Sequence, residues 1–95
     1  MKWMQNEAFL AEEFSDGELL LYDAEREVYH ILNSSATKAF RLIVANGYDR
    51  AKGVYTAWVR QIAPNLSAEI AAEDFDGIFH DLTEKAIILQ GNTTV

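Results

Sequence analysis

The chain has 95 residues, a size that suits one domain with one modest core. Its net charge is −7, and 49% of its residues are hydrophobic, as in an ordinary globular protein. It contains no cysteine, which excludes disulfides, thiolate nucleophiles and cysteine-based zinc sites. No apolar run approaches the roughly 18 residues that span a bilayer, and the first residues lack the apolar core of a signal peptide. We therefore expect a single cytoplasmic domain over residues 1–95, without a membrane partner, in which residues 90–95 form a flexible tail.

Charge is distributed unevenly along the chain. Residues 1–33 carry eight acidic and two basic side chains, residues 34–66 carry one acidic and five basic, and residues 67–95 carry six acidic and one basic. A nucleic-acid-binding domain normally presents a basic face. Because both ends are acidic, the sequence favours a partner other than nucleic acid.

The first predicted strand lies in segment 7–14. This segment alternates weakly, which places Ala8, Leu10 and Phe14 on one face. Residues 15–17 read Ser-Asp-Gly, which is a turn signal. The first strand is therefore expected to end in a hairpin.

Two further strands are predicted after this turn. The apolar run 18–22 is typical of a buried central strand. Residues 23–26 match the length of a hairpin loop, and segment 27–32 returns as a strand rich in β-branched and aromatic residues. The first and third strands then form the two edges of a three-stranded antiparallel sheet.

Three helices are predicted after the strands. Asn33 or Ser34 can cap the first, Asp49 can cap the second, and Ser67 can cap a longer third helix. Each helix carries apolar residues at helical spacing, and residues 86–89 add a final apolar stretch. Strands and helices that are segregated in this way predict an α+β domain, with the helices packed on one side of the sheet.

The residues that carry common chemistry do not form a recognisable catalytic pattern. The two histidines, His30 and His80, stand outside metal-ligand spacing and are interpreted as packed or exposed imidazoles. Ser34 and Ser35 lack a glycine elbow, and no glycine-rich phosphate loop occurs. We therefore expect no catalytic residues, no metal and no cofactor, and hence a protein that is not an enzyme.

The third predicted strand lacks the usual protection of a sheet edge. It contains no lysine or proline, and its one charged residue, Glu27, lies at its start. An exposed edge presents unpaired N–H and C=O groups to any other strand. Two interpretations stay open, because the chain's own helices could cover the strand or a peptide could complete it by β-augmentation.

Three runs of residues carry a family resemblance. Residues 16–23 read Asp-Gly-Glu-Leu-Leu-Leu-Tyr-Asp, residues 28–36 read Val-Tyr-His-Ile-Leu-Asn-Ser-Ser-Ala, and residues 74–82 read Asp-Phe-Asp-Gly-Ile-Phe-His-Asp-Leu. This order of a hairpin, a Leu-Asn junction that opens a helix and a later helix resembles the PqqD-like family over residues 8–88. Members are RiPP recognition elements, which are small peptide chaperones in pathways that modify ribosomally made peptides.

The resemblance implies a winged-helix-like domain with a groove between its third strand and its third helix. A precursor's leader peptide would lie in the groove as an added strand and be presented to a modifying enzyme. The peptide-binding residues implied on the two walls are Val28, Tyr29, His30, Ile31, Ile70, Asp74, Gly77, Ile78 and Asp81.

Two positions depart from the family pattern. Lys85-Ala86-Ile87 stands where relatives often have a glycine after the third helix, and His30 stands where many have an apolar or aromatic residue. The implied helix wall is acidic, and the chain's bases lie mostly on the first two helices. We therefore expect the ligand to place a Lys or Arg against Asp74 or Asp81.

Two other functions stay open from the sequence. A winged-helix protein could place its third helix in the major groove of DNA, although six acids and one base within 67–85 oppose phosphate contacts. The open edge strand could also pair with a second copy of the chain and form a homodimer without a peptide ligand.

Overall fold

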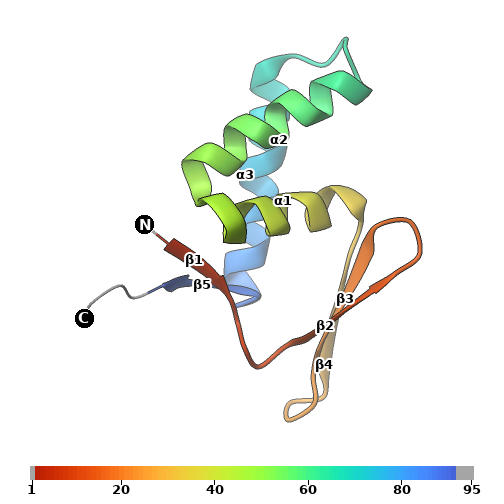
Figure 1. The fold of residues 1–95 in the computed structure, drawn as a ribbon, viewed down its shortest axis with the longest axis vertical. Coiled ribbons are helices and arrows are strands. Elements are labelled where there is room, and N and C mark those ends of the chain that lie inside the picture. The colour runs from red at the N-terminus through yellow and green to blue at the C-terminus, as the bar shows by residue number, and fades with distance from the viewer. Residues whose placement is uncertain (1, 92–95) are drawn as a thin grey trace.

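The computed structural model describes residues 2–91 (Figure 1). Three helices gather on one side, and a three-stranded antiparallel sheet extends away from them. The predicted α+β arrangement of sheet followed by three helices is confirmed. Within residues 2–91, no helix has both the length and the apolar character needed to cross a bilayer. The elements in chain order are β1 (Lys2–Gln5), β2 (Leu10–Phe14), β3 (Glu18–Asp23), β4 (Val28–Leu32), α1 (Ser34–Asn46), α2 (Tyr48–Ile62), α3 (Ala68–Glu84) and β5 (Ile88–Gly91).

The three-stranded sheet has the order β2-β3-β4, so β3 is central and the other two strands are edges. Leu20 of β3 lies opposite Glu12 of β2 and Ile31 of β4. The first turn is tight because Asp16 and Gly17 both have positive φ, of 57° and 79°. Asp and Gly tolerate this conformation better than other residues, which is why they mark hairpin turns.

The second hairpin is closed by a buried carboxylate. Asp23 is only 2% exposed, and its Oδ1 accepts hydrogen bonds from the backbone N–H groups of Glu25 and Arg26 at 3.0 and 3.2 Å. Its Oδ2 lies 3.0 Å from Arg26 Nε. These contacts satisfy the charge locally, and they hold the loop that leads into β4.

A second, two-stranded sheet was not expected from the sequence. β1 pairs antiparallel with β5, with Trp3 opposite Gln90 and Lys2 opposite Gly91. The tail expected over residues 90–95 is therefore wrong for Gln90 and Gly91, and residues 92–95 lie outside the described residues. Each of these strands has four residues, and their pairing joins opposite ends of the chain, so local patterns give little signal for it.

Two of the three expected helix caps are confirmed. Asn33 Oδ1 accepts from the Ala36 N–H at 2.8 Å, and Ser67 Oγ accepts from the Ile70 N–H at 3.1 Å. The cap expected at Asp49 is wrong, because α2 starts from Gly47 without a side-chain cap. Gly47 has φ of 84° and ends α1 as well, which leaves no intervening residue for a separate cap.

The end of α3 carries a Schellman motif without glycine. Ala86 N–H donates to Thr83 O at 3.1 Å, and Ile87 N–H donates to Leu82 O at 2.9 Å. Ala86 has φ of 55°, a left-handed conformation that is unfavourable for a residue with a Cβ atom. The helix ends at Glu84, and Ala86 takes the left-handed position that glycine commonly occupies after a helix.

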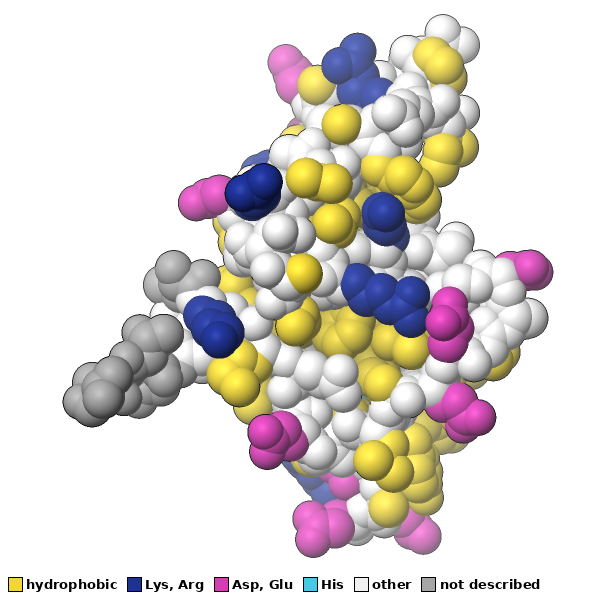
Figure 2. Space-filling model, in the orientation of Figure 1, with side chains coloured by type: hydrophobic (Ala, Val, Ile, Leu, Met, Phe, Trp, Pro, Cys, Tyr) yellow, Lys and Arg dark blue, Asp and Glu magenta, His cyan; other side chains and the backbone are white. Residues whose placement is uncertain are grey.

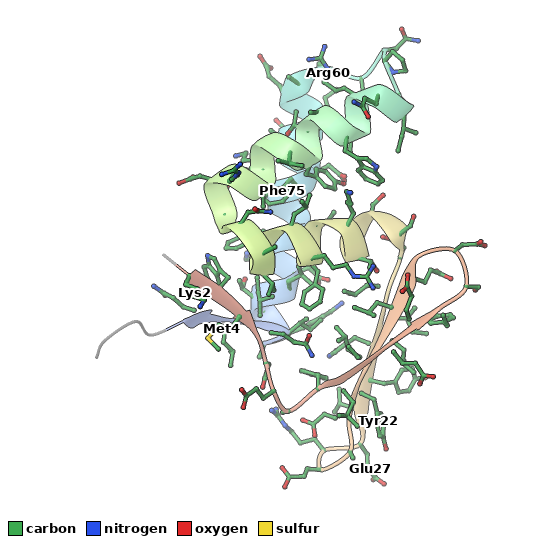
Figure 3. The ribbon with its side chains drawn as sticks, viewed as in Figure 1. Lys2, Met4, Tyr22, Glu27, Arg60 and Phe75 are labelled. Atoms are coloured by element: carbon green, nitrogen blue, oxygen red, sulfur yellow. The ribbon has the colours of Figure 1, made fainter. Side chains whose placement is uncertain are left out.

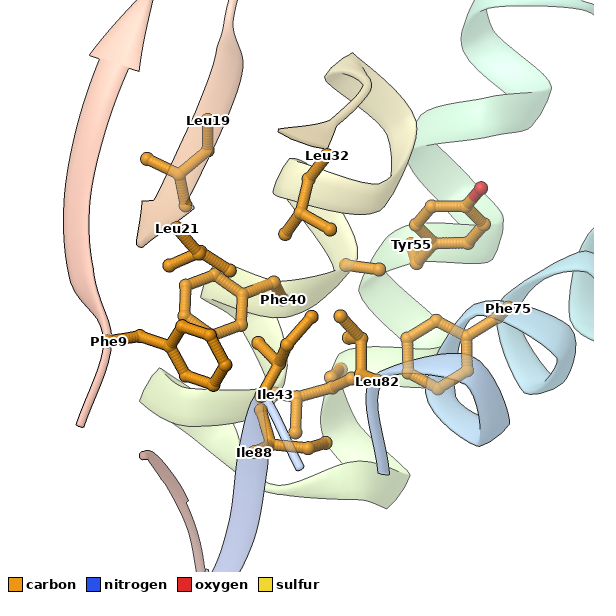
Figure 4. Close-up of a cluster of buried hydrophobic side chains, with 13 residues drawn as sticks. Phe9, Leu19, Leu21, Leu32, Phe40, Ile43, Tyr55, Phe75, Leu82 and Ile88 are labelled. Carbon is orange, nitrogen blue, oxygen red and sulfur yellow. The ribbon is translucent and has the colours of Figure 1, made fainter. Parts of the chain in front are cut away.

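The core lies between the inner face of the sheet and the helices (Figure 4). Leu19 and Leu21 of β3 face α1, whose Phe40 and Ile43 are also buried. The expectation that Leu10 and Phe14 share one face of the strand is confirmed. That face is exposed, whereas Phe9 is buried at 5% exposure. The strand begins at Leu10, so Phe9 reaches the core from the preceding bend.

Candidate functional site

The strand β4 is an exposed, apolar edge. Tyr29 and Ile31 lie on the outer face of the sheet and are 62% and 55% exposed. His30 turns to the inner face, where its ring centroid lies 5.5 Å from that of Phe9. The interpretation of His30 as a packed imidazole agrees with this position. The helices leave the outer face of β4 uncovered, so its apolar side chains stay open to a partner.

A groove of about 510 Å³ opens between α3 and the start of α1, and we call it the α3 groove. Its lining combines apolar and polar side chains, and its α3 rim is acidic. Because Asn33 caps α1, its side chain is fixed at the mouth of this groove. The residues that line it are Asn33, Ser35, Ala36, Glu73, Asp74, Gly77, Ile78, Asp81 and Leu82.

The structure places the nine expected site residues in two neighbouring regions. Asp74, Gly77, Ile78 and Asp81 line the α3 groove together. Ile70 lies one turn earlier on α3 and is 53% exposed. The remaining four belong to β4 and are not among the residues that line the groove.

The junction between β4 and α1 links these two regions. β4 ends at Leu32, and the next residue, Asn33, lines the α3 groove. Sequence reasoning missed the contribution of Asn33, Ser35 and Ala36, which form the wall opposite α3. The Leu32-Asn33 junction could have indicated this wall, because the residue that caps α1 lies directly after the last residue of β4.

Gly77 leaves room in the α3 wall. A Cβ atom at this position would meet nothing within 4 Å, so the glycine is not required by close packing. In the middle of a helix, glycine costs up to about 1 kcal/mol relative to alanine. The absent side chain instead keeps the groove open between Asp74 and Ile78, which both line it.

The two aspartates of the α3 groove already have partners within the chain. Tyr55 is fully buried, and its hydroxyl donates to Asp74 Oδ2 at 2.5 Å. Burial, together with this hydrogen bond, raises the pKa of the Tyr55 hydroxyl, which keeps it protonated as a donor. Lys85 Nζ lies 3.0 Å from Asp81 Oδ2. Asp74 and Asp81 therefore do not need a Lys or Arg of the ligand as a partner, and that reason for expecting one is wrong.

A second polar cluster joins α2 to α3. The Tyr48 hydroxyl donates to Asp76, and Lys52 Nζ lies 2.9 Å from Asp76 Oδ2. The hydrogen bonds from Tyr48 and Lys52 hold the pKa of Asp76 below its usual value. The hydrogen bonds to Asp76 raise the pKa values of both Tyr48 and Lys52. The cluster fixes the orientation of α3 relative to α2, and Asp76 is not among the residues that line the α3 groove.

In the part of the chain that the structure describes, no three His, Asp or Glu side chains are arranged to hold a metal ion. All buried side-chain nitrogen and oxygen atoms within residues 2–91 have hydrogen-bond partners. The site is thus a surface of apolar side chains, backbone groups and carboxylates, which suits binding.

No protein-family model and no curated protein matches this chain. A solved structure that is similar to it is TbiB1 in complex with the TbiA(beta) leader peptide, with a TM-score of 0.68 and 14% sequence identity. The match covers 97% of this chain and 99% of that chain. At this identity, the likeness establishes a shared fold over nearly the whole of both proteins.

Proposed function

We propose that this chain binds the leader segment of a ribosomally made precursor peptide by adding it as a strand to β4. The observation that carries the proposal is the uncharged, apolar edge of β4, which runs into the α3 groove through Leu32 and Asn33. Further support comes from TbiB1, a protein of the same fold whose structure contains a leader peptide. We infer that the chain is a PqqD-like recognition element, and that it acts without catalysis of its own.

Strand pairing alone is too weak for useful affinity. About four backbone hydrogen bonds at about 0.5–1.5 kcal/mol each give roughly 2–6 kcal/mol before ordering costs. A micromolar dissociation constant requires about 8 kcal/mol. Side chains of the leader must therefore enter pockets, and the α3 groove, whose lining includes the apolar Ile78 and Leu82, opens next to the end of the strand.

Each group of site residues has its own role in this proposal. Val28, Tyr29, His30 and Ile31 supply the backbone edge, and Tyr29 and Ile31 also pack against the leader's side chains. Gly77 and Ile78 receive an apolar leader side chain, with Ile70 extending that contact along α3. Asp74 and Asp81 form the polar rim, where their carboxylate oxygens can accept further hydrogen bonds.

The outer face of the sheet, which the leader would share at Tyr29 and Ile31, also offers a surface on which the modifying enzyme can dock. Its apolar side chains come from all three strands and include Tyr22, which is 39% exposed (Figure 3). Such patches mark interaction sites. Because residues 1–33 carry eight acids, the enzyme is expected to present an apolar centre with a basic rim. The apolar residues of this face are Leu10, Phe14, Leu20, Tyr22, Tyr29 and Ile31.

The charge of α3 weighs against binding to DNA. Residues 68–84 contain six acidic residues and no Lys or Arg. A recognition helix in the major groove approaches phosphates, which such a helix would repel. Binding of a peptide that brings apolar and basic side chains is electrostatically compatible with the same helix.

The proposal is tested with a fluorescently labelled leader peptide of the precursor gene that neighbours this chain's gene. Ile31→Pro removes one backbone donor from β4, and His30→Pro removes the adjacent donor. Adjacent residues of a strand point their N–H groups to opposite sides, so one of the two prolines acts at the free edge. We expect that variant to keep its circular dichroism spectrum and to lose leader binding by at least about tenfold.

Ala11→Pro in β2 provides the matched control at the other edge. A central strand alternates its backbone bonds between its two neighbours, so Ala11 and Ile31 point their N–H groups to equivalent sides. Ala11→Pro should leave the dissociation constant unchanged. If both β4 prolines stay folded and bind as tightly as the original chain, or if the original chain does not bind the leader, the proposal fails.

A further inference from the structure

A second groove runs over α1, and we call it the α1 groove. It consists of two hollows of about 410 and 470 Å³, and Arg41 and Ala45 line both of them. The two hollows therefore adjoin each other at these two residues. Apolar side chains dominate the lining, with Phe40 in one hollow and Trp58 in the other. On the face shown in Figure 2, apolar side chains lie in a hollow beside Lys and Arg side chains.

The charge of the α1 groove is opposite to that of the α3 groove. Lys38 and Arg41 are the only charged residues of α1, and both line the α1 groove. Lys38 Nζ lies 5.6 Å from the centre of the Trp58 ring. Arg41 Nη2 lies 3.5 Å from Glu13 Oε2, and both side chains are about half exposed. Glu13 is the only acid among the lining residues, whereas the α3 groove is lined by three acids and no base.

The two grooves meet at the first turn of α1. Ser35 and Ala36 line the α3 groove, and Ser34 and Lys38 line the α1 groove. Both grooves thus begin where β4 ends. A helix is about 10 Å across, and an extended chain covers about 3.3 Å per residue. About three to four residues beyond a strand paired with β4 are enough to reach the α1 groove.

We propose, on the basis of the leader-binding function above, that the α1 groove binds a second, acidic segment of the same precursor peptide. The segment carries Asp or Glu against Lys38 and Arg41, and an apolar side chain that packs near Trp58. An incoming carboxylate competes with Glu13 for Arg41, and this contact is long enough to exchange. Because the paired strand tethers the segment, its effective concentration is in the millimolar range, so weak contacts suffice.

The test compares two peptides and three variants. The peptides are the full leader of the neighbouring precursor gene and the same leader with its Asp and Glu outside the strand segment replaced by Asn and Gln. The variants are Lys38→Gln, Arg41→Gln and the control Arg50→Gln, an exposed base of α2 that does not line the groove. Lys38→Gln and Arg41→Gln should each weaken binding of the full leader by about threefold, and Arg50→Gln should not.

The neutralised peptide separates this inference from the function on which it rests. It should bind the original chain about tenfold more weakly than the full leader, and Lys38→Gln and Arg41→Gln should not weaken it further. If both variants bind the full leader like the original chain while the β4 proline still abolishes binding, the α1 groove is not a site but strand addition stands. If the leader does not bind the original chain, both proposals fail.

Discussion

The two edges of the three-stranded sheet are protected differently. β2 carries Glu12 and Glu13 in its middle, and charged side chains on an edge strand disfavour pairing with another chain. β4 carries no charged residue, although Tyr29 and Ile31 are more than half exposed. Within the same sheet, charged side chains therefore disfavour pairing at the β2 edge, whereas the β4 edge has no such protection. The open edge is the one that leads into the α3 groove, which is the arrangement that the proposed strand addition requires.

The largest effect on leader affinity is expected when a glutamate like those of β2 is placed on β4. Ile31→Glu places a carboxylate on the open edge and removes an apolar contact, so leader binding should weaken by about 1–1.5 kcal/mol, or roughly tenfold. Because Ile31 is 55% exposed, the free energy of unfolding should change by no more than about 0.5 kcal/mol. Fluorescence anisotropy measures the first quantity, and urea denaturation measures the second.

Leu10→Glu is the matched control for Ile31→Glu. Leu10 lies on the same outer face but on β2, and it is 69% exposed. Its substitution should leave leader affinity unchanged and should weaken only the docking of the modifying enzyme. Equal loss of leader affinity in both variants would show that the two edges are not functionally different.

A smaller effect is expected from the acidic rim beside the open edge. Asp74→Asn keeps an acceptor for the buried Tyr55 hydroxyl, so it tests charge without leaving that hydroxyl unpaired. It should weaken leader binding by about 1 kcal/mol at low salt. Asp81→Asn should cost less, since Lys85 already neutralises Asp81. Titrations at low and high salt measure both effects, and the loss should shrink as salt screens the rim.

The result for Asp74→Asn shows whether the negative charge of the α3 rim contributes to leader affinity. Unchanged affinity of both variants at low salt would leave strand addition and the apolar pocket as the whole of the interaction. A loss that disappears when the leader's basic residues are replaced would assign the contact to those residues.

Most features set by neighbouring residues could be predicted from the sequence, with the cap at Asp49 as an exception, whereas the pairing of distant segments could not. The Asp16-Gly17 turn and the caps Asn33 and Ser67 follow from local chemistry, and the structure contains all of them. The β1–β5 pair depends on residues at opposite ends of the chain. The burial of Phe9 was not predicted, because a weak alternation in a short segment does not determine which residue faces the core.

The candidate site divides in the same way. Asp74, Gly77, Ile78 and Asp81 recur at helical spacing, so their common face could be deduced, and all four line the α3 groove. The opposite wall comes from the first turn of α1, which depends on how two helices cross. Helical periodicity gives the face of each helix but not the angle or the partner of that face.

The last prediction separates stability from binding, because it acts on α3 without touching either edge. Ala86 adopts φ of 55° in the Schellman motif that ends α3. A left-handed conformation costs about 1 kcal/mol or more for a residue with Cβ, whereas glycine adopts it freely but has more unfolded-state entropy to lose. Ala86→Gly should therefore stabilise the fold by about 0.5 kcal/mol and raise the Tm by about 2–4 °C.

Leader affinity should be unchanged in Ala86→Gly, since Ala86 is not among the residues that line either groove. Thermal denaturation followed by circular dichroism, together with an anisotropy titration, checks both parts. Unchanged affinity with raised Tm would show that the losses in the edge variants do not arise from global stability. A variant that is stabilised but binds more weakly would instead show that leader binding requires the end of α3 to deform, and the open edge of β4 would then account for only part of the site.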